Sequence, residues 1–296
     1  MPNWAYNTLT IEHNDVKVLE KIKEELRGND GSPIDFDKII PMPETLNVDS
    51  PLHANDLMFY ILTLAKDRAE ILELPQEILH FIQPILDKHK TDKSLDKLYK
   101  KYIQEYTEQV IAGTADKRDD MGICLGISLL QGYRYFMNIT RYGFDTWYKW
   151  CNTMWNTKWN ASEGEVKLKG NELEYYFETA WSGPWPIAAA ISALYEGTEV
   201  TLNVGYEDPD GEDNVVYRKG RAVDAYKSPQ VYEYAEGEYD SYEEALKAAE
   251  DDGVDEDDAW AAVELSIGEN TIQLDAKDWD VNTSIIQYAK LVKESA

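Results

Sequence analysis

The sequence predicts an α+β protein in which an antiparallel sheet carries helices on one face. Segments rich in aromatic and β-branched residues, which favour strands, alternate with segments whose apolar residues recur at helical spacing. Six of the nine tryptophans fall between residues 142 and 186, and so many large rings in one segment indicate a packed core or a large contact surface. With 43% hydrophobic residues, the chain of 296 residues can bury such a core.

Residues 1–50 predict a strand, a helix and a short second strand. The segment 4–12 is rich in strand-forming residues. Asn14 or Asp15 can cap the helix that follows, and Gly28 is a stop signal after its last apolar residue. We expect the second strand at 35–43, where two prolines end it.

The next part of the chain is predicted to be helical. Strand signals stop near residue 52 and resume after 137, so we expect residues 51–139 to form an inserted helical subdomain. Its longest nearly apolar run, 123–130, is too short to cross a membrane.

Residues 140–213 predict a helix, two paired strands, a helix and a further strand. Gly170-Asn171 is a tight-turn signal, and Leu173, Tyr175 and Phe177 alternate on one face of the strand after it. Joined to the first 50 residues, this order gives the βαββαβ pattern of a ferredoxin-like sheet, with the helical subdomain between its halves.

Residues 214–296 are predicted to form an acidic α+β region. Between 207 and 280 there are 24 acidic and 6 basic residues, so this quarter of the chain carries −18 of the total net charge of −27. Ser241, followed three residues later by Glu244, reads as the start of a helix. Several short strand signals and a final helix at 284–293 favour a folded region over a disordered tail.

The net charge also limits the classes of partner. A charge of −27 disfavours direct binding to nucleic acid or to an anionic membrane, because both are polyanions. Only Cys124 and Cys151 are present, which is too few for a disulfide framework, and the N-terminus shows no signal-peptide pattern. We therefore expect a cytoplasmic protein.

No catalytic constellation is visible. The four histidines lack metal-ligand spacing, neither cysteine has an activating neighbour, and there is no glycine-rich phosphate loop. The acidic run 207–213 lacks the spacing of a calcium loop, and its Asp-Gly favours a hairpin turn instead. We expect no enzyme activity and no metal or other cofactor.

The candidate partner-binding residues are two tryptophans near the ends of predicted elements and an acidic cluster with its neighbouring tryptophan. Trp147, Trp155 and most of the tryptophan cluster at 142–186 are expected to pack inward. The candidates are Trp159, Trp185, Asp251, Asp252, Asp255, Glu256, Asp257, Asp258 and Trp260.

Three pieces of the chain resemble a known family. They are residues 1–11, residues 36–43, and residues 142–161 together with 177–186. They resemble a family of phages and conjugative plasmids whose members carry a YubB-type ferredoxin-like domain. The chain departs from it at Ala5, where the family has cysteine, and at Ser182-Gly183-Pro184, where it has Ser-Pro-Pro. The resemblance implies the fold core and a mobile-element setting. It carries over no activity and no catalytic residue.

These observations lead to one main hypothesis and two alternatives. The main one is a non-enzymatic phage or mobile-element protein in the host cytoplasm. It would bind a host protein complex as a counter-defence inhibitor. Its acidic surface would either mimic DNA in the basic channel of a defence nuclease or add electrostatic steering to an ordinary interface. The first alternative is a metal-dependent enzyme acting on a nucleotide or small molecule. The second alternative is a self-assembling structural protein. It is compatible with the main hypothesis, because an inhibitor can work as a homo-oligomer.

Overall fold

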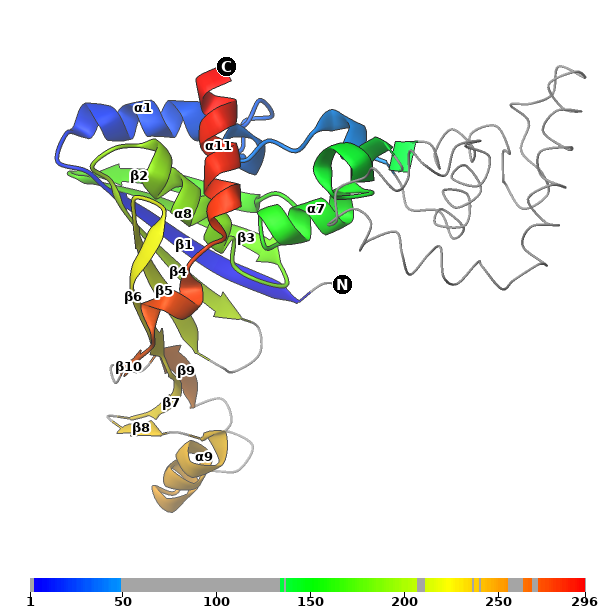
Figure 1. The fold of residues 1–296 in the computed structure, drawn as a ribbon. Coiled ribbons are helices and arrows are strands. Elements are labelled where there is room, and N and C mark those ends of the chain that lie inside the picture. Colours follow the sequence, from blue (N-terminus) through cyan, green and yellow to red (C-terminus); the bar gives the residue numbers. More distant parts are fainter. Residues whose placement is uncertain are drawn as a thin grey trace, which may run out of the picture. The chain divides into compact units, whose positions relative to one another are not determined.

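The computed structural model describes residues 3–48, 134–135, 137–206, 211–235, 237–239, 241–254, 263–267 and 271–295. The chain divides into two compact units. The first comprises Met1–Pro41 and Cys151–Ala296, and the second comprises Met42–Trp150. The first unit is built on a seven-stranded sheet with the order β10-β6-β5-β4-β1-β3-β2, in which every neighbouring pair is antiparallel (Figure 1).

Four strands and two helices of this unit form the predicted ferredoxin-like core. Along the chain they follow the order β-α-β-β-α-β, and in the sheet they lie in the order β4-β1-β3-β2, which keeps β1 between β3 and β4. The six elements are β1 (Trp4–Glu12), α1 (Val16–Leu26), β2 (Ser162–Lys169), β3 (Glu172–Ala180), α8 (Trp185–Leu194) and β4 (Glu199–Tyr206). The α+β ferredoxin-like fold class is therefore confirmed.

The helices cover one face of the sheet, as predicted. Alternate residues of β1, β3 and β4 are buried on this face, among them Leu9, Tyr175 and Leu202. Helix α8 has almost no polar residue and is buried nearly all round, because the sheet lies on one side of it and α11 (Thr283–Ser295) packs on the other (Figure 1). The opposite face of the sheet is polar and carries most of the exposed strand residues.

The prediction of a strand at 35–43 is wrong. The segment forms a 3-10 turn, η1 (Phe36–Lys38), in which the Asp35 carboxylate accepts a hydrogen bond from the backbone N–H of Asp37. Phe36, Ile39 and Ile40 are all buried, and this spacing follows a helical turn where a strand would alternate. The edge strand of the core is supplied by β2 instead.

The acidic region is not separate from the sheet. Strands β5 (Glu212–Arg218) and β6 (Arg221–Ser228) extend the sheet beyond β4, and β10 (Ile272–Gln273) adds its edge. The domain boundary predicted between 213 and 214 therefore falls inside β5, because apolar β5 residues continue the buried face of β4. The pairing of β4 with β5 confirms the hairpin reading of 207–213, although residues 207–210 lie outside the described part.

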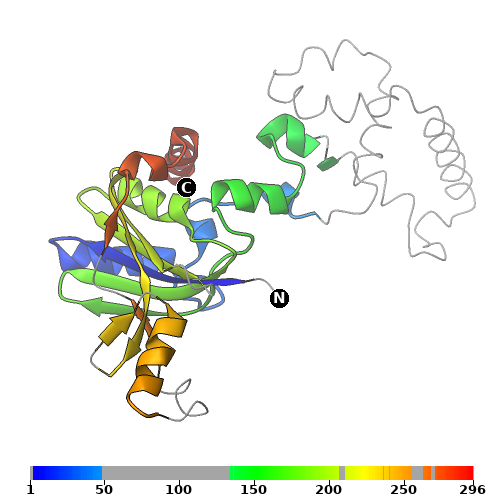
Figure 2. The same cartoon turned by 90° about the horizontal axis from the view of Figure 1, so that it is seen from below.

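A second, smaller sheet follows β6. It has the order β8-β7-β9, formed by β7 (Gln230–Tyr234), β8 (Gly237–Tyr239) and β9 (Glu264–Ile267). Helix α9 (Tyr242–Asp251) packs on β7 and β8 (Figure 2). The Ser241 hydroxyl accepts a hydrogen bond from the backbone N–H of Glu244, which confirms the predicted helix start. The chain then returns through η3 (Ala276–Trp279) to α11.

The second unit is described only at its two ends. It includes η2 (Glu44–Leu46), and the Asn138 amide donates hydrogen bonds to the carbonyls of Thr45 at 2.8 Å and Asp145 at 3.2 Å. Helix α7 (Trp147–Met154) begins in this unit. The helices predicted between 52 and 133 lie outside the described residues. None of the described helices is both long and apolar enough to span a membrane.

Candidate protein-binding surface

Four aromatic residues lie at one end of the sheet, three of them exposed and Trp4 half-buried, and we call them the tryptophan patch: Trp4, Tyr6, Trp159 and Trp181. The exposed fraction is 62% for Trp181, 51% for Tyr6 and 40% for Trp159. Trp4 and Tyr6 occupy alternate positions of β1 and therefore share a face, and the ring of Trp159 lies 6.4 Å from the ring of Trp4. Large rings left in water by a folded chain indicate a contact surface.

Trp181 is held outward by its backbone. It follows β3 directly and has a φ of +83°, a left-handed conformation that costs most side chains about 1–2 kcal/mol. Its N–H donates a hydrogen bond of 2.9 Å to the carbonyl of Asn3, at the entrance to β1. The fold thus maintains an unfavourable backbone conformation that exposes the ring.

A buried polar network fixes the loop that contains Trp181. The Thr157 hydroxyl donates to the Ala180 carbonyl at 2.9 Å, and the Asn156 amide donates to the Gly183 carbonyl at 2.9 Å. The Ser182 hydroxyl donates back to the Asn156 carbonyl. Because buried polar groups are costly to leave unpaired, these bonds hold the α7–β2 loop and the β3–α8 loop in one arrangement.

The loop that carries Trp159 is anchored from its other side. The Asn160 amide donates to the Asp35 carboxylate at 2.6 Å, and the Asn160 carbonyl oxygen accepts from the backbone N–H of Phe36 at 2.9 Å. Trp155, four residues before Trp159, is buried and donates through its ring nitrogen to the Ile40 carbonyl at 2.9 Å. Trp159 is therefore exposed on a rigid support.

An acidic hollow of about 360 Å³ lies beside the patch on the polar face of the sheet. Tyr6 and Tyr176 contribute rings, and Thr8 and Asn203 contribute polar groups. Four glutamates complete the lining: Glu163, Glu165, Glu178 and Glu212. Burial raises the pKa of the Glu212 carboxyl above its ordinary value, so ionised Glu212 is destabilised in the folded protein.

One edge of this hollow already holds a cation. The Lys167 ammonium lies 4.9 Å from the centre of the Tyr176 ring and donates a hydrogen bond of 2.6 Å to Glu165. Tyr176 and Glu165 are cross-strand partners, and so are Tyr6 and Glu178. Tyr6 and Glu178 therefore repeat the tyrosine–glutamate pairing that binds the Lys167 ammonium. No described lysine or arginine lies over Tyr6 or forms an ion pair with Glu178.

The two tryptophans predicted for the surface behave differently. Trp159 is exposed as predicted. The prediction for Trp185 is wrong, since its side chain is 9% exposed and its ring packs edge-to-face on that of Trp279 at 4.7 Å. Trp279 comes from η3, about ninety residues further along the chain, so local sequence could not reveal this cover. Trp181 was missed, although it directly precedes the Ser182-Gly183-Pro184 break and satisfies the same criterion of lying near an element end.

The acidic candidates lie in another part of the chain. Asp251 and Asp252 are exposed at the C-terminal end of α9, where negative charge opposes the helix dipole. Asp255, Glu256, Asp257, Asp258 and Trp260 lie outside the described residues. No described contact joins Asp251 or Asp252 to the tryptophan patch.

The described residues offer little for catalysis. Within them, no group of three or more His, Cys, Asp and Glu side chains is arranged to hold a metal ion. Burial, and next the charge of Asp37, raises the pKa of the Cys151 thiol to about 12. A thiol of this kind stays protonated near neutral pH and is a poor nucleophile.

The sheet order and the one-sided helices define a ferredoxin-like α+β protein. Residues 154–248 match a family model described as "Ferredoxin-like domain in Api92-like protein". The crystal structure of the protein api92 from Yersinia pseudotuberculosis is similar, with 12% sequence identity, a TM-score of 0.36, and coverage of 80% of this chain and 99% of that one. A search of curated proteins finds no match.

Proposed function

We propose that the protein is a non-enzymatic binding protein that holds a basic segment of another protein on its tryptophan patch and acidic hollow. The observation that carries the proposal is Trp181, which is 62% exposed at a φ of +83° within a hydrogen-bonded support. A fold gains no stability from this arrangement, whereas a binding surface does gain from a rigid, exposed ring.

The chemistry of the hollow favours a cationic partner group. Arginine is the side chain that combines stacking on an aromatic ring with bidentate bonding to a carboxylate. Tyr6 and Glu178 offer these two features side by side, in the manner in which Tyr176 and Glu165 hold Lys167. Direct nucleic-acid binding is disfavoured, because the same surface presents four glutamates.

The narrower proposal concerns the setting. The partner is a host protein complex in the cytoplasm, and the protein acts as a counter-defence inhibitor from a phage or another mobile element. The net charge of −27 supports the DNA-mimic form of this proposal, since the basic channel of a nuclease attracts any polyanion. The family resemblance of the sequence supports the mobile-element setting.

Self-assembly through the patch has less support. In a two-fold symmetric contact, the acidic hollow of one copy would meet the acidic hollow of the next, and like charges brought together oppose association. A metal-dependent activity remains the alternative, although no acidic group among the described residues is arranged to hold a metal ion. Adding magnesium, manganese or calcium to the binding assay below separates that alternative.

The test is a titration of the protein with an arginine-rich peptide, followed by tryptophan fluorescence and calorimetry. We expect saturable binding that weakens at least tenfold in Trp181→Gly and in Trp159→Ala, which corresponds to about 1.4 kcal/mol or more. The matched control is Tyr148→Ala, which removes an aromatic side chain of 48% exposure from another part of the chain.

The control fixes the interpretation. Retained binding in Tyr148→Ala, together with loss in the patch variants, supports the proposed surface. Equal affinity in all variants, or equal affinity for a peptide in which glutamine replaces arginine, contradicts it. A thermal melt that rises with divalent cations while the peptide has no effect favours the enzyme alternative.

A further inference from the structure

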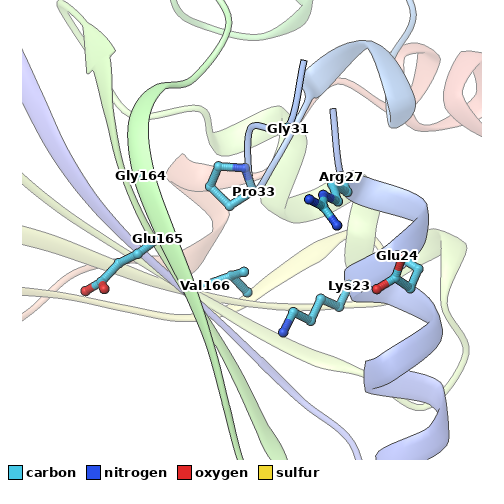
Figure 3. A pocket seen from close by; sticks show the side chains of 8 residues that line it. All are labelled: Lys23, Glu24, Arg27, Gly31, Pro33, Gly164, Glu165 and Val166. Atoms are coloured by element: carbon cyan, nitrogen blue, oxygen red, sulfur yellow. The ribbon is translucent and has the colours of Figure 1, made fainter. Parts of the chain in front are cut away.

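A second hollow, of about 220 Å³, lies on the other side of β2 (Figure 3). Helix α1 forms one wall with Lys23, Glu24 and Arg27, the loop after α1 contributes Gly31 and Pro33, and the third side comes from β2 at Gly164, Glu165 and Val166. Its volume is several times the roughly 30 Å³ that one water molecule occupies in the liquid, so a polyatomic group fits.

Two cationic side chains face this hollow from the same side of α1. Lys23 and Arg27 are four residues apart, which places them one above the other on the helix. Figure 3 shows both side chains reaching from α1 towards β2. Neither forms a hydrogen bond or an ion pair with another residue of the described part of the chain.

The nearest strand carboxylate does not compensate these cations. Glu165 and Val166 are consecutive in β2 and therefore point to opposite faces, and Figure 3 shows Glu165 directed away from the hollow. Its charge is already paired, since Glu165 accepts the hydrogen bond from Lys167 at 2.6 Å. Glu24 remains as the one acidic group on the α1 side of the lining.

One buried hydroxyl on the face of the sheet that Val166 shares has no partner among the described residues. Tyr175 is the cross-strand neighbour of Val166 and shares its face of the sheet. The Tyr175 hydroxyl is fully buried and has no hydrogen-bond partner among the described residues. Tyr175 is not part of the lining of the hollow, so the inference rests on Lys23 and Arg27.

We infer that this hollow binds an oxyanion, a phosphate or carboxylate group, between Lys23 and Arg27. An arginine and a lysine together supply a planar donor pair and a flexible ammonium, the combination that recognises such groups. The inference is independent of the proposed protein-binding function, which uses the opposite face of β2. It gives the strongly acidic chain a local site of the opposite sign.

The overall charge of −27 does not prevent such binding. At physiological salt the Debye length is about 8 Å, so remote surface carboxylates are largely screened and the nearest groups dominate. Basic residues in the last turn of a helix also interact favourably with the helix dipole and so stabilise the helix. A loss of stability in a variant would therefore not distinguish a ligand site from a helix cap, and the test needs a binding readout.

The test is an NMR titration of the full chain with inorganic phosphate, and separately with acetate, at ionic strength held constant with sodium chloride. We expect saturable shifts of the Gly31 and Gly164 amides and of the Arg27 side-chain N–H. The anion that gives the stronger saturable response identifies the group that is bound. In Lys23→Gln and in Arg27→Gln the affinity should fall at least fivefold, and Lys23→Arg should retain it.

Lys17→Gln is the matched control, because it removes the same charge from the exposed first turn of α1. Retained binding in this variant, with loss in Lys23→Gln, supports the site. Shifts that stay linear with anion concentration, or that weaken equally in Lys17→Gln, overturn the inference, since they report only general attraction of anions to cations.

Discussion

The backbone N–H of Trp181 lies 2.9 Å from the carbonyl oxygen of Asn3 and donates a hydrogen bond to it. This bond joins the end of β3 to Asn3, the residue directly before β1. The same backbone has a φ of +83° at Trp181, so the bond and the strain occur at one residue. Exposure of the ring therefore has a cost to the fold.

Replacing Trp181 by glycine should leave the free energy of unfolding unchanged or raise it, by up to about 1 kcal/mol. Glycine adopts a positive φ without strain, so the substitution relieves about 1–2 kcal/mol of backbone strain. Part of this gain is offset, because glycine raises the conformational entropy of the unfolded chain. Urea denaturation measures the result. A loss above 1 kcal/mol would show that the ring stabilises the fold, contrary to its role as a binding group.

Trp155→Phe should destabilise the protein by about 1–3 kcal/mol. The substitution removes the ring nitrogen that bonds the Ile40 carbonyl, and a buried carbonyl without a partner carries that penalty. Trp159→Phe is the control, because Trp159 is 40% exposed and surface substitutions usually stay within about 0.5 kcal/mol. Equal stabilities of the two variants in urea would contradict the assigned roles.

The sequence predicts the parts of the fold in which local pattern and tertiary structure agree. The strand at Trp4–Glu12, its capped helix and the hairpin at Gly170-Asn171 follow from residues close together in the chain. The turn at Phe36–Lys38 was mistaken for a strand because three apolar residues near two prolines fit either structure. What decides it is the bond from Trp155 to Ile40, across more than a hundred residues.

The candidate site was less predictable for the same reason. Trp159 and Trp185 both lie near element ends, and the ring of Trp185 is covered by Trp279 from a distant part of the sequence. The acidic hollow gathers glutamates from β2, β3 and β5, which are separate segments of the sequence. Its composition depends on strand order, which periodicity alone does not supply.

Tyr195→Phe should lower stability at neutral pH and have less effect in acid. Burial works to raise the pKa of Glu25, but hydrogen bonds from Tyr195 at 2.7 Å and Lys293 at 3.0 Å outweigh it, so the pKa lies below its ordinary value. A lowered pKa contributes stability above the unfolded value of about 4.3, and this stability is lost as pH falls through the folded pKa.

The expected loss in Tyr195→Phe at pH 7 is below about 1 kcal/mol, because Glu25 is partly exposed and solvent screens the interaction. Urea denaturation at pH 7 and at pH 3 measures the difference between the variant and the native chain. A difference of the same size at both pH values would show that the Glu25 charge does not contribute. Lys21→Met, which removes a longer contact of 3.5 Å to Glu25, serves as the control with a smaller effect.

Glu212→Gln should stabilise the protein at pH 7 while weakening the binding of an arginine-rich peptide. Burial raises the pKa of Glu212, so the folded state binds more protons than the unfolded state between the unfolded value of about 4.3 and the folded pKa. Stability of the native chain therefore falls as pH rises through this window. Glutamine removes that penalty, by no more than about 1 kcal/mol because the side chain is only partly buried.

The gain in Glu212→Gln should disappear below pH 4, where the native carboxyl is protonated in both states. Glu163→Gln removes the same charge from an exposed position of the hollow and is the control for the change in stability. Urea denaturation across pH 3 to 8 and peptide titration at pH 7 measure the two effects. Higher stability with unchanged peptide affinity would remove Glu212 from the binding surface. Lower stability at pH 7 would mean that the Glu212 carboxylate already forms favourable interactions within the folded chain, contrary to its proposed role in binding a cationic partner.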